Sequence, residues 1–157
     1  MANDIKQFSI QVDDGFQKIP IRNLHGDEVG VFYFNPTDMG IIQRYNEFAQ
    51  NFDYITEPLE SLSDAGEDKT GEIADGQEKA LNDATERLYE AMNKLFNADV
   101  ASAFFGKVHP FSPVDGEFYC TKALESIRAF ISEQFDIQAA KINKRVDKYT
   151  KIVKKKK

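Results

Sequence analysis

The strongest structural signal of this chain is a strand followed directly by a helix, within residues 29–52 (VGVFYFNPTDMGIIQRYNEFAQNF). Valine, phenylalanine and tyrosine favour a half-buried strand up to residue 34. Pro36 then ends the strand, because proline has no N–H to donate to a neighbouring strand. Thr37 or Asp38 can cap the helix that follows. The apolar residues of this helix recur at helical spacing and therefore share one face: Ile41, Tyr45, Phe48 and Phe52.

Two segments upstream predict further strands that pair with this one. Residues 8–12 alternate apolar with polar side chains, which is the period of a strand with one buried face. The sequence DDG at residues 13–15 is a turn signal, and residues 16–21 resume the strand pattern. Since the connections are short, neighbouring strands are expected to be antiparallel. The sequence therefore predicts a three-stranded β-meander over residues 1–36.

A helical part is predicted for residues 37–135, interrupted by an acidic loop over residues 53–78. The loop segment holds nine acidic residues against one lysine, and it also contains Pro58 and several glycines, a composition that favours a solvated loop. No spacing within it matches a calcium-binding EF-hand loop. The helical period returns in residues 77–96, and Asp99 can cap a short helix after that.

One long helix is predicted from about residue 117 onward, because no glycine or proline occurs after Gly116. Its first half carries a regular apolar stripe and should belong to the core. Residues 136–157 form a basic extension: residues 141–157 carry +8, and since the whole chain carries −6, the remainder carries −14. The extension also has a thin apolar seam, of the kind that packs on another helix: Ile142, Val146, Tyr149 and Val153.

Recognisable motifs for chemistry are absent from the sequence. It contains no phosphate-binding loop, no HExxH, no CxxC and no GxSxG nucleophile elbow. Cys120 is the single cysteine, which excludes a disulfide within the chain, and its spacing suits a buried helix position. His25 and His109 lie in no catalytic signature. We therefore predict a protein that is not an enzyme, with no catalytic residues, no metal site and no cofactor.

Size and composition indicate one globular domain spanning residues 1–157. A chain of 157 residues, 41% hydrophobic and 29% charged, is long and apolar enough to bury a core. The fold class that fits the pattern is α+β: a small N-terminal β-meander followed by a helical bundle that ends in a long C-terminal helix. The N-terminal residues lack the apolar centre of a signal peptide, and no apolar run is long enough to cross a bilayer. These features predict a cytoplasmic protein without membrane contact.

The segment FNPTD at residues 34–38, which ends the predicted meander and precedes helices and an acidic loop, resembles the tail assembly chaperones of long-tailed phages. It is similar also to phage and prophage proteins with the same strand-to-helix segment. The resemblance covers residues 5–52 and, more loosely, the helices to about residue 135. It implies a non-enzymatic role in virion morphogenesis in the host cytoplasm. The resemblance implies binding to the tape measure protein and/or tail tube subunits. Such a chaperone coats the aggregation-prone tape measure protein while tail tube subunits polymerise around it, and it is absent from the finished virion.

Partner binding is predicted at two surfaces, the Phe-rich sheet and the C-terminal seam, and self-association into a homo-oligomer is predicted at the same places. The predicted partner-binding residues are Phe32, Phe34, Ile142, Val146, Tyr149 and Val153. The alternative function is a nucleic-acid-binding or DNA-packaging accessory protein that uses the basic C-terminal helix. The charge of −14 on the remaining chain would repel nucleic acid and disfavours it. An enzyme with a carboxylate site is a third class, because such sites leave no sequence signature.

Overall fold

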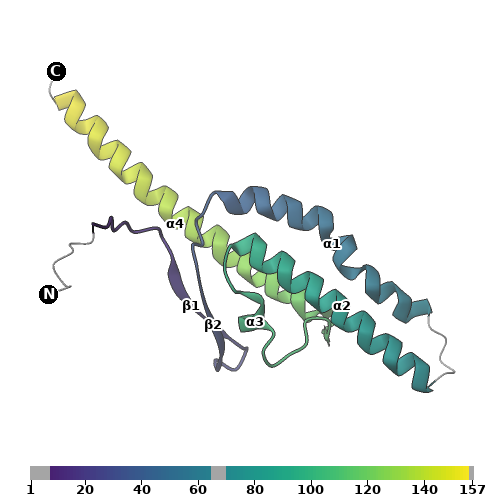
Figure 1. Cartoon of the computed structure of the whole chain (residues 1–157). Helices are drawn as coiled ribbons and strands as arrows, with labels where there is room; N and C mark the ends of the chain where they lie inside the picture. The colour runs from purple at the N-terminus through teal and green to yellow at the C-terminus, as the bar shows by residue number, and fades with distance from the viewer. Residues whose placement is uncertain (1–7, 65–69, 156–157) are drawn as a thin grey trace, which may run out of the picture.

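The structure is a computed structural model that describes the backbone of residues 8–64 and 70–155 and the side chains of residues 8–60 and 76–146. The fold is mixed α+β with a helical majority (Figure 1). Among the described residues, two small antiparallel sheets of two strands each accompany the helices. In chain order the elements are β1 (Gln17–Arg22), β2 (Glu28–Phe34), α1 (Gly40–Asp64), α2 (Thr70–Phe96), α3 (Ala101–Phe104), β3 (Pro113–Val114), β4 (Glu117–Phe118) and α4 (Tyr119–Lys155).

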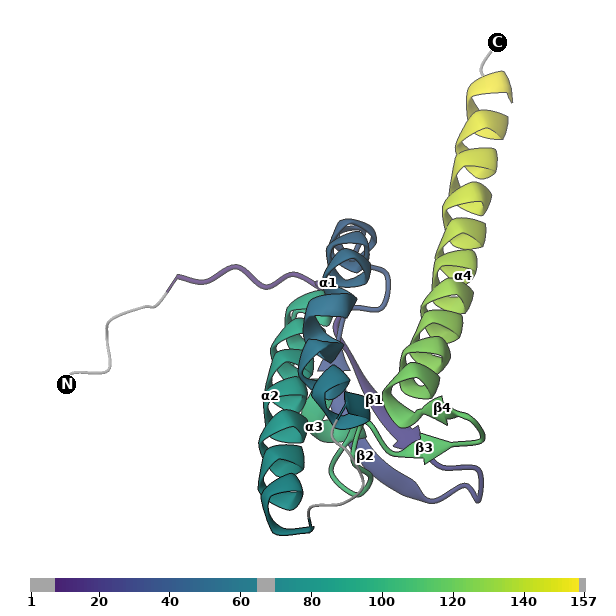
Figure 2. The same ribbon diagram turned by 90° about the vertical axis from the view of Figure 1, so that its right-hand side faces the viewer.

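The N-terminal sheet consists of β1 and β2, so the prediction of a third strand over residues 8–12 is wrong. That segment runs away from the sheet (Figure 2), and the side chains of Phe8 and Ile10 are each 95% exposed. The predicted turn at residues 13–15 is also absent, because the chain forms neither a turn nor a bend there, although the Asp13 carboxylate accepts a hydrogen bond from the Gly15 N–H at 3.0 Å and Gly15 has the predicted positive φ of 82°. The local preferences of Asp13 and Gly15 are therefore predicted correctly from the sequence, whereas the hairpin that they were expected to form is not.

Alternation along β2 decides which of its side chains are buried. Phe32 and Phe34 point into the core, whereas Tyr33 between them is exposed on the outer face. The ring of Phe34 lies edge-on to that of Phe96 in α2, with centroids 5.8 Å apart, and the rings of Phe32 and Phe104 lie 5.5 Å apart. Phe32 and Phe34, predicted as partner-binding residues, are therefore core residues, and their burial holds the sheet against the helices.

The short helix α3 packs directly on β2. Gly30 permits this approach, because a Cβ there would collide with the carbonyl oxygen of Ala103. The predicted Asp99 cap is wrong: Val100 is the residue that precedes α3, and the Asp99 carboxylate accepts a hydrogen bond from the Ser102 hydroxyl at 2.9 Å. Instead the Asn93 side chain of α2 accepts hydrogen bonds from two N–H groups at the start of α3, at 2.9 and 3.0 Å. A tertiary contact thus fixes where this helix begins.

Helices α1 and α2 lie side by side and antiparallel (Figures 1 and 2). Residues 53–64 continue α1 and residues 70–78 belong to α2, so the prediction of an acidic loop over these residues is wrong. Residues 65–69, the middle of that predicted loop, lie outside the described part of the chain. Apolar residues of the two helices, such as Ile55 in α1 and Ala84 in α2, are buried. Their burial stabilises the helices even though the outer faces are acidic.

Pro58 stands inside α1, where a proline normally interrupts a helix. Because proline has no N–H, the carbonyl of Tyr54 one turn earlier lacks its usual helical donor. Arg87 of α2 supplies one, with its Nη1 donating to this carbonyl at 2.7 Å and its guanidinium 4.0 Å from the centroid of the Tyr54 ring. A partner from the neighbouring helix thus makes the proline tolerable, and α1 continues past it.

A tight hairpin leads into α4. Between β3 and β4, Asp115 and Gly116 both have positive φ (52° and 83°), as a two-residue Asp-Gly turn requires. The carbonyls of Ser112 and Pro110 then accept hydrogen bonds from the N–H groups of Tyr119 and Cys120, each at 2.8 Å. These bonds satisfy the first N–H groups of α4, which have no partner within the helix, and so fix its starting point.

Helix α4 has 37 residues and is therefore about 55 Å long. Its first half belongs to the core: Cys120 and Ile127 are buried, and the ring of Phe130 lies 6.5 Å from that of Phe34. Its second half projects beyond the other elements (Figures 1 and 2). Every described side chain in residues 139–146 is exposed. The long helix predicted from the sequence is present, and only half of it has neighbours among the described residues.

Candidate partner-binding groove

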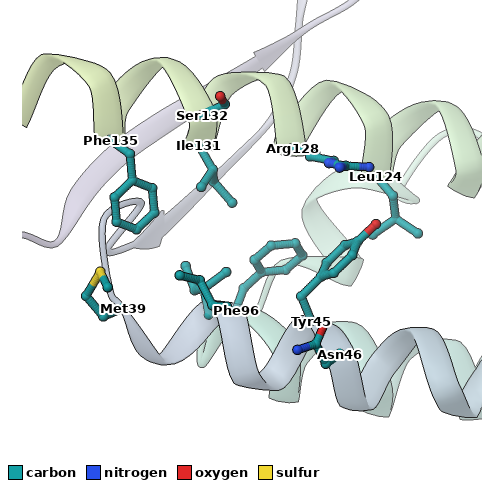
Figure 3. Close-up of a pocket in the computed structure, with 11 residues that line it drawn as sticks. Met39, Tyr45, Asn46, Phe96, Leu124, Arg128, Ile131, Ser132 and Phe135 are labelled. Atoms are coloured by element: carbon teal, nitrogen blue, oxygen red, sulfur yellow. The ribbon is translucent and has the colours of Figure 1, made fainter. Parts of the chain in front are cut away.

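A groove lies between the first half of α1 and the first half of α4, and we call it the α1–α4 groove (Figure 3). Its volume is about 370 Å³, and most of the side chains that line it are apolar. The two helices form opposite walls, and the Phe96 ring from the end of α2 lies between them. The main apolar lining residues are Met39, Ile42, Tyr45, Leu124, Ile131 and Phe135.

A second hollow of about 340 Å³ continues the groove along the same two helices. It shares Tyr45, Leu124 and Arg128 with the first and extends to Phe48 and Phe52. Two adjoining hollows with shared walls make one elongated apolar surface. Such a shape suits a row of side chains from an extended or helical segment better than a single compact ligand.

The first wall is held in place by Arg44 on another side of α1. Its Nη2 lies 2.8 Å from the Asp38 carboxylate, and its Nε donates to the carbonyl of Leu95, near the end of α2, at 2.8 Å. The Asp38 carboxylate also accepts a hydrogen bond from the Gly40 N–H at 2.9 Å, which begins the helix as the sequence predicts. Hydrogen bonds from Arg44 and from Gly40 hold the pKa of Asp38 below its ordinary value.

The second wall is positioned by the buried face of α4. Cys120, Ala123 and Ile127 pack into the core, and this orientation turns Leu124 and Ile131 toward α1. Burial raises the pKa of the Cys120 thiol to about 11, because the thiolate would lie in apolar surroundings. Cys120 is therefore a packing residue here, and its thiol is protonated at neutral pH.

One positive charge lies among the apolar lining residues of the groove. The guanidinium carbon of Arg128 lies 5.8 Å from the centroid of the Tyr45 ring, which places the cation at the aromatic wall. Both side chains take part in both hollows. A segment that binds here with apolar contacts would gain further from an acidic side chain or a chain carboxylate near Arg128.

His109 lies outside the groove, in the connection between α3 and β3, and its ring makes two structural contacts. His109 accepts a hydrogen bond at Nδ1 from the N–H of Phe111 at 3.1 Å, and its Nε2 lies 3.3 Å from the Thr85 hydroxyl. The Nδ1 contact requires the tautomer with its proton on Nε2, which can donate to Thr85. Within the described part of the chain, no group of three or more His, Cys, Asp or Glu side chains is placed to hold a metal ion.

The predicted partner-binding residues fall into three sets. Phe32 and Phe34 are buried in the core. Ile142 and Val146 are 59% and 56% exposed on the projecting half of α4, where a partner could reach them. The side chains of Tyr149 and Val153 lie outside the described ones, although α4 itself continues through both residues.

The groove itself is missing from the sequence prediction, although its two walls are recognisable as separate helix faces. Tyr45 belongs to the predicted apolar face of the first helix, and Leu124 and Phe135 belong to the stripe of the last. Their meeting across a gap depends on the tertiary packing of α1 and α4. One signal was available in the sequence: Met39 and Ile42 are apolar but fall outside the regular apolar face predicted for this segment. In the structure both are exposed.

Comparison with known proteins gives no match among protein-family models, curated proteins or solved structures. Among the described residues, no helix combines the length and the apolar character that crossing a membrane requires. The physical basis for a function is therefore the α1–α4 groove, the exposed side chains of Ile142 and Val146 in α4 and the distribution of charge.

Proposed function

We propose that this protein is a non-enzymatic chaperone that binds an amphipathic helix of its client in the α1–α4 groove. The observation that carries the proposal is the groove itself: an elongated, mainly apolar surface between two helices, with one cation at its centre. Helices bind to such grooves by inserting apolar side chains that recur every three or four residues. Arg128 favours clients with an acidic residue beside that apolar stripe.

The client that best fits this chemistry is the tape measure protein of a long-tailed phage. The FNPTD segment at residues 34–38 supports this choice through its resemblance to tail assembly chaperones. A tape measure protein is a long helix with apolar stripes, which aggregates unless those stripes are covered. A chaperone for it needs an apolar groove and no catalytic site, and tail tube subunits would displace it during assembly in the host cytoplasm.

The test uses labelled synthetic helical peptides, each about 20 residues long, that tile the product of a very long coding region next to this gene. We expect peptides with an apolar stripe to bind and Ile42→Glu to weaken binding at least about tenfold, since a buried charge without a partner is costly. Ile42 lines the groove and is 54% exposed, so the substitution leaves the core intact. Tyr33→Glu is the matched control, because Tyr33 is 58% exposed on the outer sheet face.

Two results would count against the proposal. One is that no peptide binds the wild-type protein at micromolar concentrations. The other is that Ile42→Glu and Tyr33→Glu bind with equal affinity, which would place the binding surface elsewhere. Absence of a very long coding region beside the gene would remove the tape measure protein as client, but it would leave helix binding in the groove to be tested with other peptides.

A nucleic-acid-binding accessory protein is the second candidate, and exposed cations on the projecting half of α4 favour it. Lys141, Lys144 and Arg145 are all exposed and lie within little more than one helical turn. If they contact phosphates, binding of duplex DNA should weaken steeply as salt rises, and alanine at all three positions should flatten that dependence. We expect no such binding at physiological salt, because the remaining chain carries −14.

A further inference from the structure

The apolar lining of the α1–α4 groove continues in phase onto the second half of α4, from Ile137 onward. We call this projecting segment the bare half of α4. Leu124, Ile131 and Phe135 line the groove, and Ile142 and Val146 follow them at spacings of seven and four residues. These spacings return to the same side of an α-helix, so all five residues share one face. One half of this face therefore forms a wall of the groove, and the other half is exposed.

Charge divides α4 in the same way. The groove-forming segments, residues 38–53 and 117–136, each carry a formal charge of −2 with Arg128 included, giving −4 together, so the groove as a whole is acidic around this one cation. The described part of the bare half, residues 137–146, carries +3. A parallel pair of α4 helices would place the two basic halves side by side and repel. An antiparallel pair would place each basic half over an acidic, grooved half, and complementary charge of this kind fixes orientation more than affinity.

We propose that two copies of this chain form an antiparallel dimer in which the bare half of each α4 lies in the α1–α4 groove of the other copy. The midpoint of α4 is Ile137, which is 41% exposed and would lie near the two-fold axis. Ile142 and Val146 of one copy then pack among the apolar residues of the other copy's groove. The arrangement is closed, because the same two surfaces meet twice around one two-fold axis.

The dimer goes beyond the proposed chaperone function and does not depend on it. A second copy and a client helix would use the same groove, so they compete for it. The groove would then be covered in the free protein and open to a client only when the α4 pair separates. Such competition keeps an aggregation-prone apolar surface out of water until a client is present.

The first experiment measures mass by sedimentation equilibrium at tens of micromolar. We expect the wild-type protein to have twice the monomer mass of 17.9 kDa and Val146→Glu to be monomeric. Val146 lies on the bare helix, so the substitution should leave the core unchanged, and thermal unfolding monitored by circular dichroism checks this. Tyr33→Glu, on the exposed sheet face, should remain dimeric. A monomeric wild-type protein, or a dimeric Val146→Glu, would overturn the proposal.

The second experiment determines orientation by distances between spin labels attached to introduced cysteines, since the buried native Cys120 should remain unlabelled. In the antiparallel dimer, labels at Ala140→Cys lie about 9 Å apart along the helix axis, and labels at Ser126→Cys lie about 33 Å apart. A parallel pair of α4 helices would give short distances between the labels at both sites, and this result would contradict the proposed antiparallel dimer. Peptide binding to the monomeric Val146→Glu protein then tests the chaperone function separately. If the wild-type protein is an antiparallel dimer and the Val146→Glu protein binds no peptide, only the chaperone function is rejected.

Discussion

Arg87 should stabilise the protein mainly because Pro58 interrupts the hydrogen bonding of α1. The perturbation is Arg87→Ala, which removes the donor to the Tyr54 carbonyl and the cation from the Tyr54 ring. It also removes a contact of 3.7 Å with the carboxylate of Glu57, whose side chain is 65% exposed.

The hydrogen bond to a charged donor contributes about 1.5 kcal/mol, at the low end because the site is near the surface. The guanidinium over the Tyr54 ring adds about 0.5 kcal/mol at an exposed position. The ion pair with Glu57 should contribute nothing measurable, because it is long and solvated. Arg87→Ala should therefore lower the free energy of unfolding by about 2 kcal/mol. For a chain of this size, that corresponds to a fall in Tm of about 4–8 °C.

Urea unfolding followed by circular dichroism measures the cost of Arg87→Ala in two backgrounds, the wild-type protein and Pro58→Ala. In Pro58→Ala, the new residue has an N–H that can donate to the Tyr54 carbonyl, so the loss of Arg87 should cost only about 1 kcal/mol. Arg87→Lys keeps the charge without the planar guanidinium, so its free energy of unfolding should lie between those of the wild-type protein and Arg87→Ala. Equal costs of Arg87→Ala in both backgrounds, within about 0.3 kcal/mol, would refute the idea that Arg87 compensates for the proline.

Three further predictions concern other sites. Asp38→Asn should reduce the loss of stability on acidification, as measured by urea unfolding between about pH 5 and pH 2. Because the pKa of the Asp38 carboxyl is lower in the folded than in the unfolded protein, its ionised form stabilises the fold above the unfolded pKa of about 4, and this stabilisation is lost as the pH falls through the folded pKa. Cys120 should not react with a thiol reagent at about pH 8 until the protein unfolds, because its pKa is raised to about 11; rapid labelling of native protein would contradict this. Asn93→Ala should lower the free energy of unfolding by about 1–2 kcal/mol, and Asn93→Asp, which keeps the accepting oxygen, by less.

Local signals predict the centre of this fold well. Residues 29–52 form the strand and the helix that their composition indicates, and Asp38 begins the helix with its side chain. The uninterrupted last helix is equally local, because it depends on the conformational preferences of its own residues. Segments of this kind are read correctly since nothing distant overrides them.

Features that depend on distant contacts were predicted wrongly. The alternation in residues 8–12 indicates a strand, but a strand needs a partner, and the described structure provides none. Pro58 indicates a helix break, but Arg87 in another helix offsets the missing hydrogen bond. Along β2 the period of two identifies two sets of side chains without saying which is buried, so Phe32 and Phe34 were assigned to the wrong face.

The bare half of α4 poses a physical problem that the proposed dimer would solve. Short isolated helices are only marginally stable in water, because helix formation is nucleated at a cost and most helical stability in proteins comes from packing. From residue 139 onward this packing is missing among the described side chains, and the like charges of Lys141 and Arg145, one turn apart, repel. Continuity with the anchored first half removes the nucleation cost, but it adds no burial for Ile142 or Val146. Contact between these residues and a groove supplies that burial, so one interaction would both stabilise the helix and cover the apolar surface.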